Sequence, residues 1–528
     1  MPGGIAPATD FDPAASVPPP APPERRIFCN RTLNLRGIRA IGYDLDYTLA
    51  HYHVAEWERT SFEHLRRKLL ARGWPVEEAR FDLHAYQVGL ILDLKLGNII
   101  KANQFGYVKR GAHGGALLDF DRLRETYAET IVEFPDPRFV FLNTLFSLSE
   151  ACMYARLVDL LDAGRIPGTL GYAELYRLMK ESLDEAHMEG RLKEEIGAAP
   201  ERFIDLDPDT PRALLDQRRA GNRILLITNS DWPHTRGMMS YAFDPFLPEG
   251  VTWRELFDIV IVSARKPAFF TQEQPAFEVV DDEGLLRPLV SRPSLGSVLL
   301  GGHAGLVEEM LGLSGAQILY VGDHAYGDVH VSKNLRRWRT ALIIRELEDE
   351  IRAQEAFRER QEELERLMDR KVLLERQLSL RRLAILRLKS EKAGGSRGQV
   401  AESRGAGREI REPGDRRAGA AQVRDPHSRA AAQRQASRRG LEEGVEATRQ
   451  ALSAIDERIT PLARASAELL NRDWGLLLRS GNDKSYLGRL VERHADIYTS
   501  RVSNLLYESP FAFFRAHRGL MPHDAREE

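Results

Sequence analysis

The sequence predicts a doubly wound α/β fold built around a parallel sheet. Short apolar runs rich in β-branched residues recur along the chain, polar or glycine residues follow each run at once, and amphipathic stretches separate the runs. Strands buried on both faces read as continuous apolar runs, and a parallel sheet needs helical crossovers between its strands. The carboxyl ends of such strands face one crevice, so we expect the polar residues that follow them to meet there.

The apolar runs place the individual strands. The first strand is predicted at residues 38–43, inside IRAIGYDLDYTLA, and it ends in an acidic turn. The later ones lie in RILLITNSD (223–231), DIVIVSARK (258–266), QILYVGDHAYGD (317–328) and RTALII (339–344). The stretch PDTPRALLDQRRAGN has an apolar face and then a glycine before the next strand, which is typical of a crossover helix.

The length of 528 residues is too great for one ordinary domain, so we predict several units. Residues 1–26 are rich in Pro and Ala and predict a disordered tail. Residues 27–50 and 200–350 would form the α/β core. Residues 51–199 are far longer than a crossover and contain helical patterns such as FLNTLFSLSEACMYARLVDLLDAG, so we predict an inserted cap.

The sequence predicts a helical hairpin arm over residues 351–465. Its two apolar seams have spacings close to a heptad, one at Leu364, Leu367, Leu374, Leu378, Ile385 and Leu388 and the other at Leu441, Val445, Leu452, Ile455 and Ile459. The pattern favours a coiled-coil-like structural arm or dimer contact over a catalytic role. Residues 466–528 are expected to pack on the core or on a dimer partner.

Between the two seams, about residues 394–440, Arg, Ala, Gly and Ser dominate and large apolar residues are nearly absent. This composition predicts a low-complexity, poorly ordered loop. It lacks the interleaved aromatic residues that stack on bases, so a solvated loop is favoured over an RNA contact. A local reading-frame error would also produce such an abrupt change of composition.

Composition indicates a soluble cytoplasmic protein. A net charge of -3 from 75 basic and 78 acidic residues produces no overall field that would attract nucleic acid or an anionic membrane. Cys29 and Cys152 cannot form a disulfide framework or a zinc cluster. We find no signal-peptide-like apolar run at the N-terminus, and no window approaches the roughly 20 apolar residues of a membrane span.

Two carboxylates, Asp44 and Asp46, lie at the end of the first predicted strand, in DLDYT. If both face the crevice, one can attack phosphorus while the other handles the proton of the leaving group. Taken alone, the same pattern also fits a solvated turn or part of a calcium site.

The next two strand ends carry a hydroxyl, an amide and a cation. Thr228 and Asn229 follow RILLI, where the Thr hydroxyl and backbone N–H groups could hold phosphoryl oxygens. A Thr-Asn pair is also common in turns and helix caps. Lys266, in SARKPAFF, could neutralise a transferring phosphoryl group, although most lysines are solvated surface residues.

A second acidic pair, Asp323 and Asp328, follows another predicted strand in GDHAYGD. Carboxylate oxygens suit Mg²⁺, and the glycines allow a tight turn. We expect His324 to be structural, because a lone histidine supplies no coordination set.

In the order D-x-D-x-T, Thr-Asn, Lys, G-D-x(4)-D, these motifs resemble those of the haloacid dehalogenase phosphatase superfamily. Longer runs are similar to the purine-specific (IMP/GMP-type) cytosolic 5′-nucleotidase family. They include FCNRTLNLRGIRAIGYDLDYTLAHY, LLITNSDW, ARKPAFF, ILYVGDHAYGDVHVSK and the terminal RSGNDKSYLGRLVERHADIYTSRVSNLLYESPFAFFRAHRGLMPHD. The resemblance covers most of residues 27–350 and about 475–525.

The resemblance implies a haloacid dehalogenase-like core and in-line phosphoryl transfer. Asp44 would be the nucleophile, Asp46 the general acid and base, and Thr228 and Lys266, with Asn229 beside them, would hold the phosphoryl group. A Mg²⁺ cofactor would be bound by Asp44, the carbonyl of Asp46 and Asp323, with Asp328 acting through water or by orienting Lys266. Such enzymes can also pass the phosphoryl group to another nucleoside. We expect a homo-oligomer, a dimer or a tetramer.

The substrate implied by the resemblance is a purine nucleoside 5′-monophosphate, with the cap setting specificity. The matching cap positions are Asn143, Phe146, Asp184, His187 and Lys193. An aromatic ring such as Phe146 can stack on a purine, and a carboxylate such as Asp184 can accept from its N–H edge. Phe146 could equally belong to the core of the cap. Lys180 stands in KESLDEAH where the family usually has an arginine, and a lysine lacks the bidentate fork, so base preference stays open.

Two other functions fit parts of the pattern. The four motifs act on the phosphoryl group and do not depend on the rest of the substrate. The enzyme could therefore be a phosphatase of another phosphorylated metabolite. The chain could also be a non-catalytic scaffold that uses its arm for assembly. The competent side chains at all four motifs argue against the scaffold.

Overall fold

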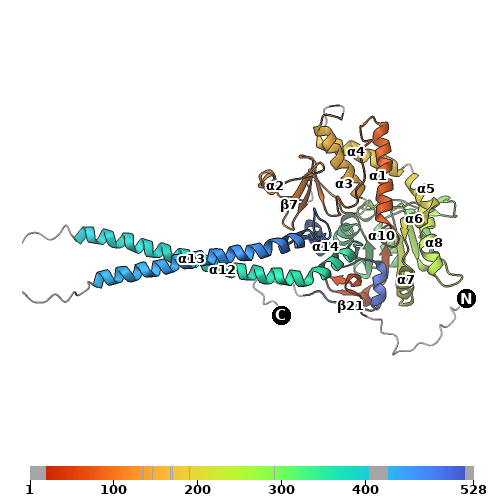
Figure 1. The fold of residues 1–528 in the computed structure, drawn as a ribbon. Helices are drawn as coiled ribbons and strands as arrows, with labels where there is room; N and C mark the ends of the chain where they lie inside the picture. Colours follow the sequence, from red (N-terminus) through yellow and green to blue (C-terminus); the bar gives the residue numbers. More distant parts are fainter. Residues whose placement is uncertain are drawn as a thin grey trace, which may run out of the picture. The chain divides into compact units, whose positions relative to one another are not determined.

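The computed structural model describes residues 20–133, 136–144, 147–166, 168, 171–188, 191–289, 292–402 and 426–517 (Figure 1). Within these ranges, the side chains of residues 187, 188, 191, 326, 391–402 and 426–431 are not described. The chain divides into two compact units, Met1–Gln354 with Glu468–Glu528, and Glu355–Ala467. Among the described residues, no helix combines the length and apolar character that a membrane crossing requires.

A ten-stranded sheet forms the centre of the first unit, in the order β1-β20-β17-β16-β3-β11-β12-β15-β13-β14. Seven neighbouring strands, from β20 to β15, run parallel, and the outer strands β1, β13 and β14 pair antiparallel. The strands are β1 (Phe28–Cys29), β3 (Ala40–Tyr43), β11 (Arg223–Ile227), β12 (Ile259–Val262), β13 (Ala276–Val279), β14 (Leu286–Pro288), β15 (Val298–Gly301), β16 (Ile318–Gly322), β17 (Arg339–Ile343) and β20 (Ile497–Thr499).

Both faces of this sheet are buried. Along β11, Ile224 and Leu226 belong to one apolar cluster, whereas Leu225 and Ile227 belong to a second cluster. This alternation follows from the two-residue period of a strand, and it explains why the strands read as continuous apolar runs. The predicted mixed α/β fold with a parallel-sheet core is therefore confirmed.

Helices cover the two faces and connect the parallel strands. The second cluster also contains Phe269, Val307 and Val331, from α9, α10 and α11, while the first contains Leu214 and Met238, from α7 and α8. These helices are α7 (Asp209–Arg219), α8 (Trp232–Phe243), α9 (Ala268–Thr271), α10 (Ala304–Leu311) and α11 (Val331–Arg336).

The long segment between β4 (His51–Tyr52) and β10 (Ile204–Asp205) has its own sheet as well as helices. The two flanking strands pair with each other, and the segment between them holds a five-stranded antiparallel sheet in the order β8-β7-β6-β5-β9. Its strands are β5 (Ile91–Asp93), β6 (Asn98–Ala102), β7 (Val108–His113), β8 (Ala116–Leu117) and β9 (Phe139–Phe141). We call residues 53–203 the inserted segment.

The helices of the inserted segment pack mainly on one another. Helices α1, α3 and α4 lie side by side and contact each other (Figure 1). Their apolar residues, among them Leu65, Met153 and Leu175, join the first apolar cluster. The α-helices among the described residues of this segment are α1 (Val54–Ala71), α2 (Phe120–Tyr127), α3 (Leu148–Asp162), α4 (Tyr172–Met188), α5 (Arg191–Ala198) and α6 (Pro200–Phe203).

The described residues of the second unit form two antiparallel helices. Within it, Lys371 pairs with Asp456 at 2.7 Å, and Leu364, Leu367 and Ile459 form an apolar cluster between the helices. The helices, α12 (Leu347–Glu402) and α13 (Pro426–Ala467), extend into both ends of the stretch predicted to be a low-complexity loop. At the start of α13, residues 426–440 are rich in alanine, glutamine and arginine, which are good helix formers and account for the helix there. Residues 403–425 lie outside the described residues.

The ends of the chain contribute to the first unit. After α13, β18 (Arg479–Ser480) and β19 (Asp483–Lys484) form a hairpin, and α14 (Tyr486–His494) follows it. Strand β20 then extends the central sheet beside β17. The last strand, β21 (Phe513–Phe514), pairs with β2 (Leu33–Asn34). The disordered tail was predicted to extend to residue 26, but residues 23–25 are ordered in the structure. Arg25 lies in a short 3₁₀ turn and donates from Nη2 to the Ser503 hydroxyl at 2.8 Å, a partner that local composition does not reveal.

Candidate active site

Four strand ends bring the predicted catalytic residues together. Asp44 follows β3, and its neighbours β11 and β16 are followed by Thr228 and Asp323. Lys266 follows β12, which lies next to β11. The Asp44 amide donates to the carbonyl of Val321 at 2.9 Å, and the Thr228 amide donates to the carbonyl of Ile261 at 2.9 Å, so backbone pairing fixes both strand ends.

Lys266 lies between two carboxylates. Its Nζ atom is 2.7 Å from Oδ2 of Asp44 and 2.8 Å from Oδ1 of Asp328, and it donates to the Tyr320 hydroxyl at 3.1 Å. The Lys266 side chain is only 4% exposed. A buried ammonium needs paired charges, and these two carboxylates supply them.

Burial and charge act together on the two central groups. Burial raises the pKa of Asp44 above its ordinary value, more than the Lys266 ammonium lowers it. Burial alone would lower the pKa of Lys266, but the charges of Asp328 and Asp44 raise it well above its ordinary value. The lysine is therefore cationic, and its charge offsets part of the effect of burial on Asp44.

Three carboxylates form a cluster that fits a divalent metal ion. Asp44, Asp323 and Asp328 each offer an oxygen within 4.8 Å of the others. Opposite ligands on Mg²⁺ lie about 4.2 Å apart, so these oxygens are close to a common coordination sphere. Burial, with the charges of Asp328 and Asp44, raises the pKa of Asp323 well above its ordinary value. A bound cation would relieve this repulsion, so the residues fit Mg²⁺.

Asp328 depends on the glycine at the end of β16. A Cβ atom at Gly322 would lie 2.5 Å from Oδ2 of Asp328, a distance that no side chain tolerates. The same carboxylate oxygen accepts from the amide of His324 at 3.2 Å. The glycine of the G-D-x(4)-D motif is thus required for the close approach of Asp328, in addition to any role in turning the chain.

Three donors surround Asp46. The Tyr52 hydroxyl donates to Oδ1 at 2.5 Å, the Ser230 hydroxyl donates to Oδ2 at 2.7 Å, and Nε2 of His234 lies 3.6 Å from Oδ1. Burial raises the pKa of Asp46, but these donors, His234 first, lower it more, so the pKa lies below its ordinary value. The carboxylate is ionised and held in a defined orientation.

The turn after β11 is cross-linked to the turn after β12. The Asn229 side chain accepts from the Lys266 amide at 2.6 Å and donates to the Lys266 carbonyl at 3.3 Å. Thr228 is fully buried, and its hydroxyl accepts from the Ser230 amide at 3.0 Å. Asn229 therefore positions the lysine, whereas the Thr228 hydroxyl orders the turn.

Sequence reasoning missed four residues of this site: Tyr52, Ser230, His234 and Tyr320. Tyr320 is a polar interruption in the apolar run of β16, and Ser230 follows Thr228-Asn229 in the same turn, so each left a weak signal. Tyr52 and His234 carry none, because a single polar residue beside a helix or strand is common.

Two of the predicted substrate residues lie close to the site. Asn143 lines a cavity of about 30 Å³ together with Asp323, and its buried Oδ1 accepts no hydrogen bond within the described part of the chain. Lys193, from α5, lies 2.7 Å from Oδ2 of Asp231, which caps the first turn of α8 just beyond Thr228.

Another two predicted residues pair with each other on α4. Nζ of Lys180 is 2.9 Å from Oε2 of Glu150 and 3.6 Å from Oδ1 of Asp184. The Asp184 side chain is 56% exposed, so it remains accessible to a ligand. Phe146 and the side chain of His187 lie outside the described residues.

Comparisons with known proteins place the chain in a family. The sequence model of the 5′ nucleotidase family matches residues 27–526. A human protein, 5′-nucleotidase domain-containing protein 2, is 28% identical over 344 residues, or 62% of this chain and 64% of that protein. The chain thus matches less than two thirds of the length of that relative.

A solved structure of archaeal beta-phosphoglucomutase from Pyrococcus sp. strain ST 04 aligns with 58% of this chain and 86% of its own. At 11% identity and a TM-score of 0.27, this similarity supports no conclusion about fold. The family match extends over nearly the whole sequence. The chain belongs to the 5′ nucleotidase family.

Proposed function

We propose that this chain is a Mg²⁺-dependent 5′-nucleotidase that hydrolyses purine nucleoside 5′-monophosphates, of the IMP or GMP kind, through an aspartyl phosphate on Asp44. Family membership supports hydrolysis of a phosphoric monoester. The observation that carries the mechanism is the position of the Lys266 ammonium, 2.7 Å from Asp44 and 2.8 Å from Asp328. A cation fixed beside a buried carboxylate neutralises a phosphoryl group that the carboxylate attacks.

In the first step, an Oδ atom of Asp44 attacks phosphorus and the bond between phosphorus and the 5′ oxygen breaks. The negative charge of the bound phosphate raises the pKa of Asp46. Asp46 therefore takes up a proton in the substrate complex and gives it to that oxygen, so the nucleoside leaves as a neutral alcohol. The Lys266 ammonium and the backbone N–H groups of the turn after β11 compensate the charge on the phosphoryl oxygens.

In the second step, water attacks the phosphorus of the aspartyl phosphate. Asp46, now ionised, takes a proton from the water, the bond between phosphorus and Asp44 breaks, and inorganic phosphate leaves. If the 5′ hydroxyl of another nucleoside replaces water, the same step transfers the phosphoryl group. General acid and base catalysis of this kind contributes about 10² to 10⁴ in rate.

The metal would be held by Asp44, the backbone carbonyl of Asp46 and Asp323, with Asp328 acting through water. When bound, Mg²⁺ would supply positive charge that favours ionised Asp44 and offsets the charge of the phosphoryl oxygens. Asp328 has a second role in this proposal, because its ion pair with Lys266 holds the ammonium in place.

Residues of the inserted segment would select the nucleoside. Asn143 supports this assignment, because it lines the cavity that Asp323 also lines and its Oδ1 accepts no hydrogen bond from the described residues. Lys193 and Asp184 would contact the ribose and the N–H edge of the base. Since Lys180 pairs with Glu150 and Asp184, it would orient the acidic residue that reads the base.

A panel of phosphate esters tests the proposal. Phosphate release is measured with Mg²⁺ from IMP, GMP, AMP, a pyrimidine nucleotide and a sugar phosphate. We expect kcat/KM to be highest for IMP or GMP. Equal rates for all esters would instead favour a general metabolite phosphatase, and no release from any ester would favour a scaffold.

A further inference from the structure

The inserted segment joins the core through two short strands, and one of them carries a side chain that reaches the catalytic carboxylate. Strands β4 and β10 pair antiparallel, with Tyr52 opposite Ile204 and His51 opposite Asp205. The His53 amide continues the pairing by donating to the carbonyl of Phe203 at 2.7 Å. These strands form the hinge between the core and the inserted segment.

Tyr52 points from the hinge toward Asp46. Its ring is 4% exposed and packs against Tyr47 and Trp57, with ring centroids 5.1 and 4.4 Å away. Its hydroxyl donates to Oδ1 of Asp46 at 2.5 Å. The ring contacts leave the hydroxyl little freedom, so the carboxylate oxygen is held at a place set by the hinge.

A carboxylate offers about four acceptor positions. Tyr52 donates to Oδ1 of Asp46, His234 lies 3.6 Å from the same oxygen, and Ser230 donates to Oδ2. An acceptor position that these groups leave open is available to pass a proton to or from a reacting oxygen. Removing a single donor would therefore free the carboxylate to rotate, and the reactive lone pair would no longer point in one direction.

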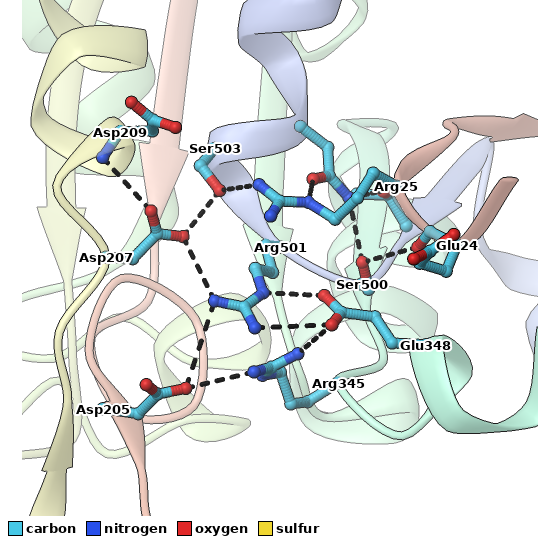
Figure 2. A network of polar contacts seen from close by, with 12 residues as sticks. Glu24, Arg25, Asp205, Asp207, Asp209, Arg345, Glu348, Ser500, Arg501 and Ser503 are labelled. Atoms are coloured by element: carbon cyan, nitrogen blue, oxygen red, sulfur yellow. Dashed lines mark hydrogen bonds and ion pairs between the residues drawn. The ribbon is translucent and has the colours of Figure 1, made fainter. Parts of the chain in front are cut away.

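The second hinge strand is fixed by a network of charges (Figure 2). Arg345 binds Asp205 at 3.0 Å and Glu348 at 2.6 Å. Arg501 reaches Glu348 at 2.7 Å and lies 3.7 Å from Asp207, just after the hinge. The Arg501 and Glu348 side chains are 15% and 4% exposed, so solvent screens these pairs only weakly.

Strand β4 lies between this network and Asp46. Consecutive residues of a strand face opposite ways, so His51 faces the network while Tyr52 faces the catalytic carboxylate. His51 is 1% exposed, and burial, with the charges of Arg345 and Arg501, lowers its pKa to about 4. A neutral imidazole thus lies beside the arginines and completes the packing of the hinge.

We propose that Tyr52 is a positioning residue for Asp46, and that the network of Arg345, Arg501, Glu348 and Asp205 holds the hinge strands that place its hydroxyl. The position of the inserted segment is then coupled to the orientation of the general acid. This inference rests on the proposed function, because it assigns Asp46 the proton transfer.

Two esters with different leaving groups test the inference. IMP releases an alkoxide that needs a proton, whereas p-nitrophenyl phosphate releases a phenolate that needs none. The ratio kcat/KM reports the first step, in which only IMP needs the proton, and excludes the second step, which both esters share. We expect Tyr52→Phe to lower kcat/KM for IMP about 10-fold to 100-fold and to change kcat/KM for p-nitrophenyl phosphate less than about threefold. KM for IMP should be nearly unchanged, because Tyr52 holds the acid and not the substrate.

Tyr127→Phe is the matched control. The Tyr127 hydroxyl is also buried and also donates to a carboxylate, Oδ2 of Asp93 at 2.9 Å, but this contact joins α2 to β5 within the inserted segment. We expect this variant to keep the wild-type ratio of the two rates. Melting curves on each variant establish that the assays measure folded protein.

Arg501→Gln tests the network, assayed below its melting temperature. We expect it to lower kcat/KM for IMP relative to kcat/KM for p-nitrophenyl phosphate. The change should have the same direction as in Tyr52→Phe and be smaller. A wild-type rate ratio in folded Arg501→Gln would overturn the role of the network. Equal losses on both esters in Tyr52→Phe, or no loss, would overturn the positioning role. Wild-type protein that hydrolyses neither ester would overturn the proposed function itself.

Discussion

Lys193 of the inserted segment forms an ion pair with Asp231 of the core, with Nζ 2.7 Å from Oδ2. Asp231 begins α8, and its other carboxylate oxygen accepts from the His234 amide at 3.0 Å. The pair therefore connects the inserted segment to the turn that carries Thr228 and Asn229. Both side chains are partly exposed, at 36% and 48%, so each remains available to a ligand.

We expect Lys193→Ala to raise KM for IMP several-fold with little change in stability. A partly exposed ion pair contributes about 0–1 kcal/mol, so the free energy of unfolding should change by less than that. Steady-state kinetics and urea unfolding measure the two quantities. Lys371→Ala, which removes a similar ion pair with Asp456 in α12, is the control and should leave KM unchanged. An unchanged KM in Lys193→Ala would exclude Lys193 from the substrate site.

Asp44→Asn should abolish turnover and leave the fold intact. The amide keeps the shape of the carboxylate but is not a nucleophile, so kcat should fall by on the order of 10⁴ or more. Lys266 keeps its ion pair with Asp328, and the buried ammonium is not left without a partner. Phosphate release and a thermal melt measure activity and folding. Substantial hydrolysis by the folded variant would reject the covalent mechanism.

The strands around the site could be predicted because each is a short run buried on both faces. β11, β12, β16 and β17 lie inside the predicted runs, and β3 begins at Ala40, two residues after the predicted start. β20 could not be found in this way. It has only three residues, one of them partly exposed, and it becomes a strand through its pairing with β17. The five-stranded sheet was missed for the same reason, since its strands are short and several contain polar residues.

The charged part of the site could also be predicted, because acidic and basic residues at strand ends are visible in the sequence. The residues that orient them could not. Tyr52 is eight residues beyond Asp44, and His234 lies in the first turn of α8, so neither has a local signal. Their roles follow from distances to Asp46, which only the folded chain defines.

Glu58 should make stability depend on pH. It is fully buried on α1, and burial raises its pKa to about 8, above the roughly 4.3 of an unfolded chain. Between these values the folded state binds more protons than the unfolded state, so the free energy of unfolding should fall as pH rises from about 4.5 to 8.

Glu58→Gln removes this proton uptake. The variant should match the wild-type protein near pH 5 and exceed its stability by a few kcal/mol at pH 8. Urea titrations at several pH values measure the slope. Glu63→Gln, on the same helix but partly exposed and paired with Arg66, should keep the wild-type slope. Parallel slopes for Glu58→Gln and the wild-type protein would show that Glu58 is ionised in the folded state.

Asp323 should lower the stability of the protein when no metal is bound and raise it when Mg²⁺ is bound. Asp44, Asp323 and Asp328 repel one another when no cation is bound, so Asp323→Asn should be at least as stable as the wild-type protein in EDTA. With Mg²⁺ at about 100 times its Kd, the wild-type protein should gain about 2.7 kcal/mol, and the variant should gain far less because it has lost a ligand. Melting temperatures with EDTA and with Mg²⁺ measure both effects. Asp282→Asn, whose side chain is 76% exposed, is the control and should keep the Mg²⁺ response. A variant destabilised in EDTA would contradict the repulsion within the cluster. A variant that gains as much from Mg²⁺ as the wild-type protein would place the metal ligands elsewhere.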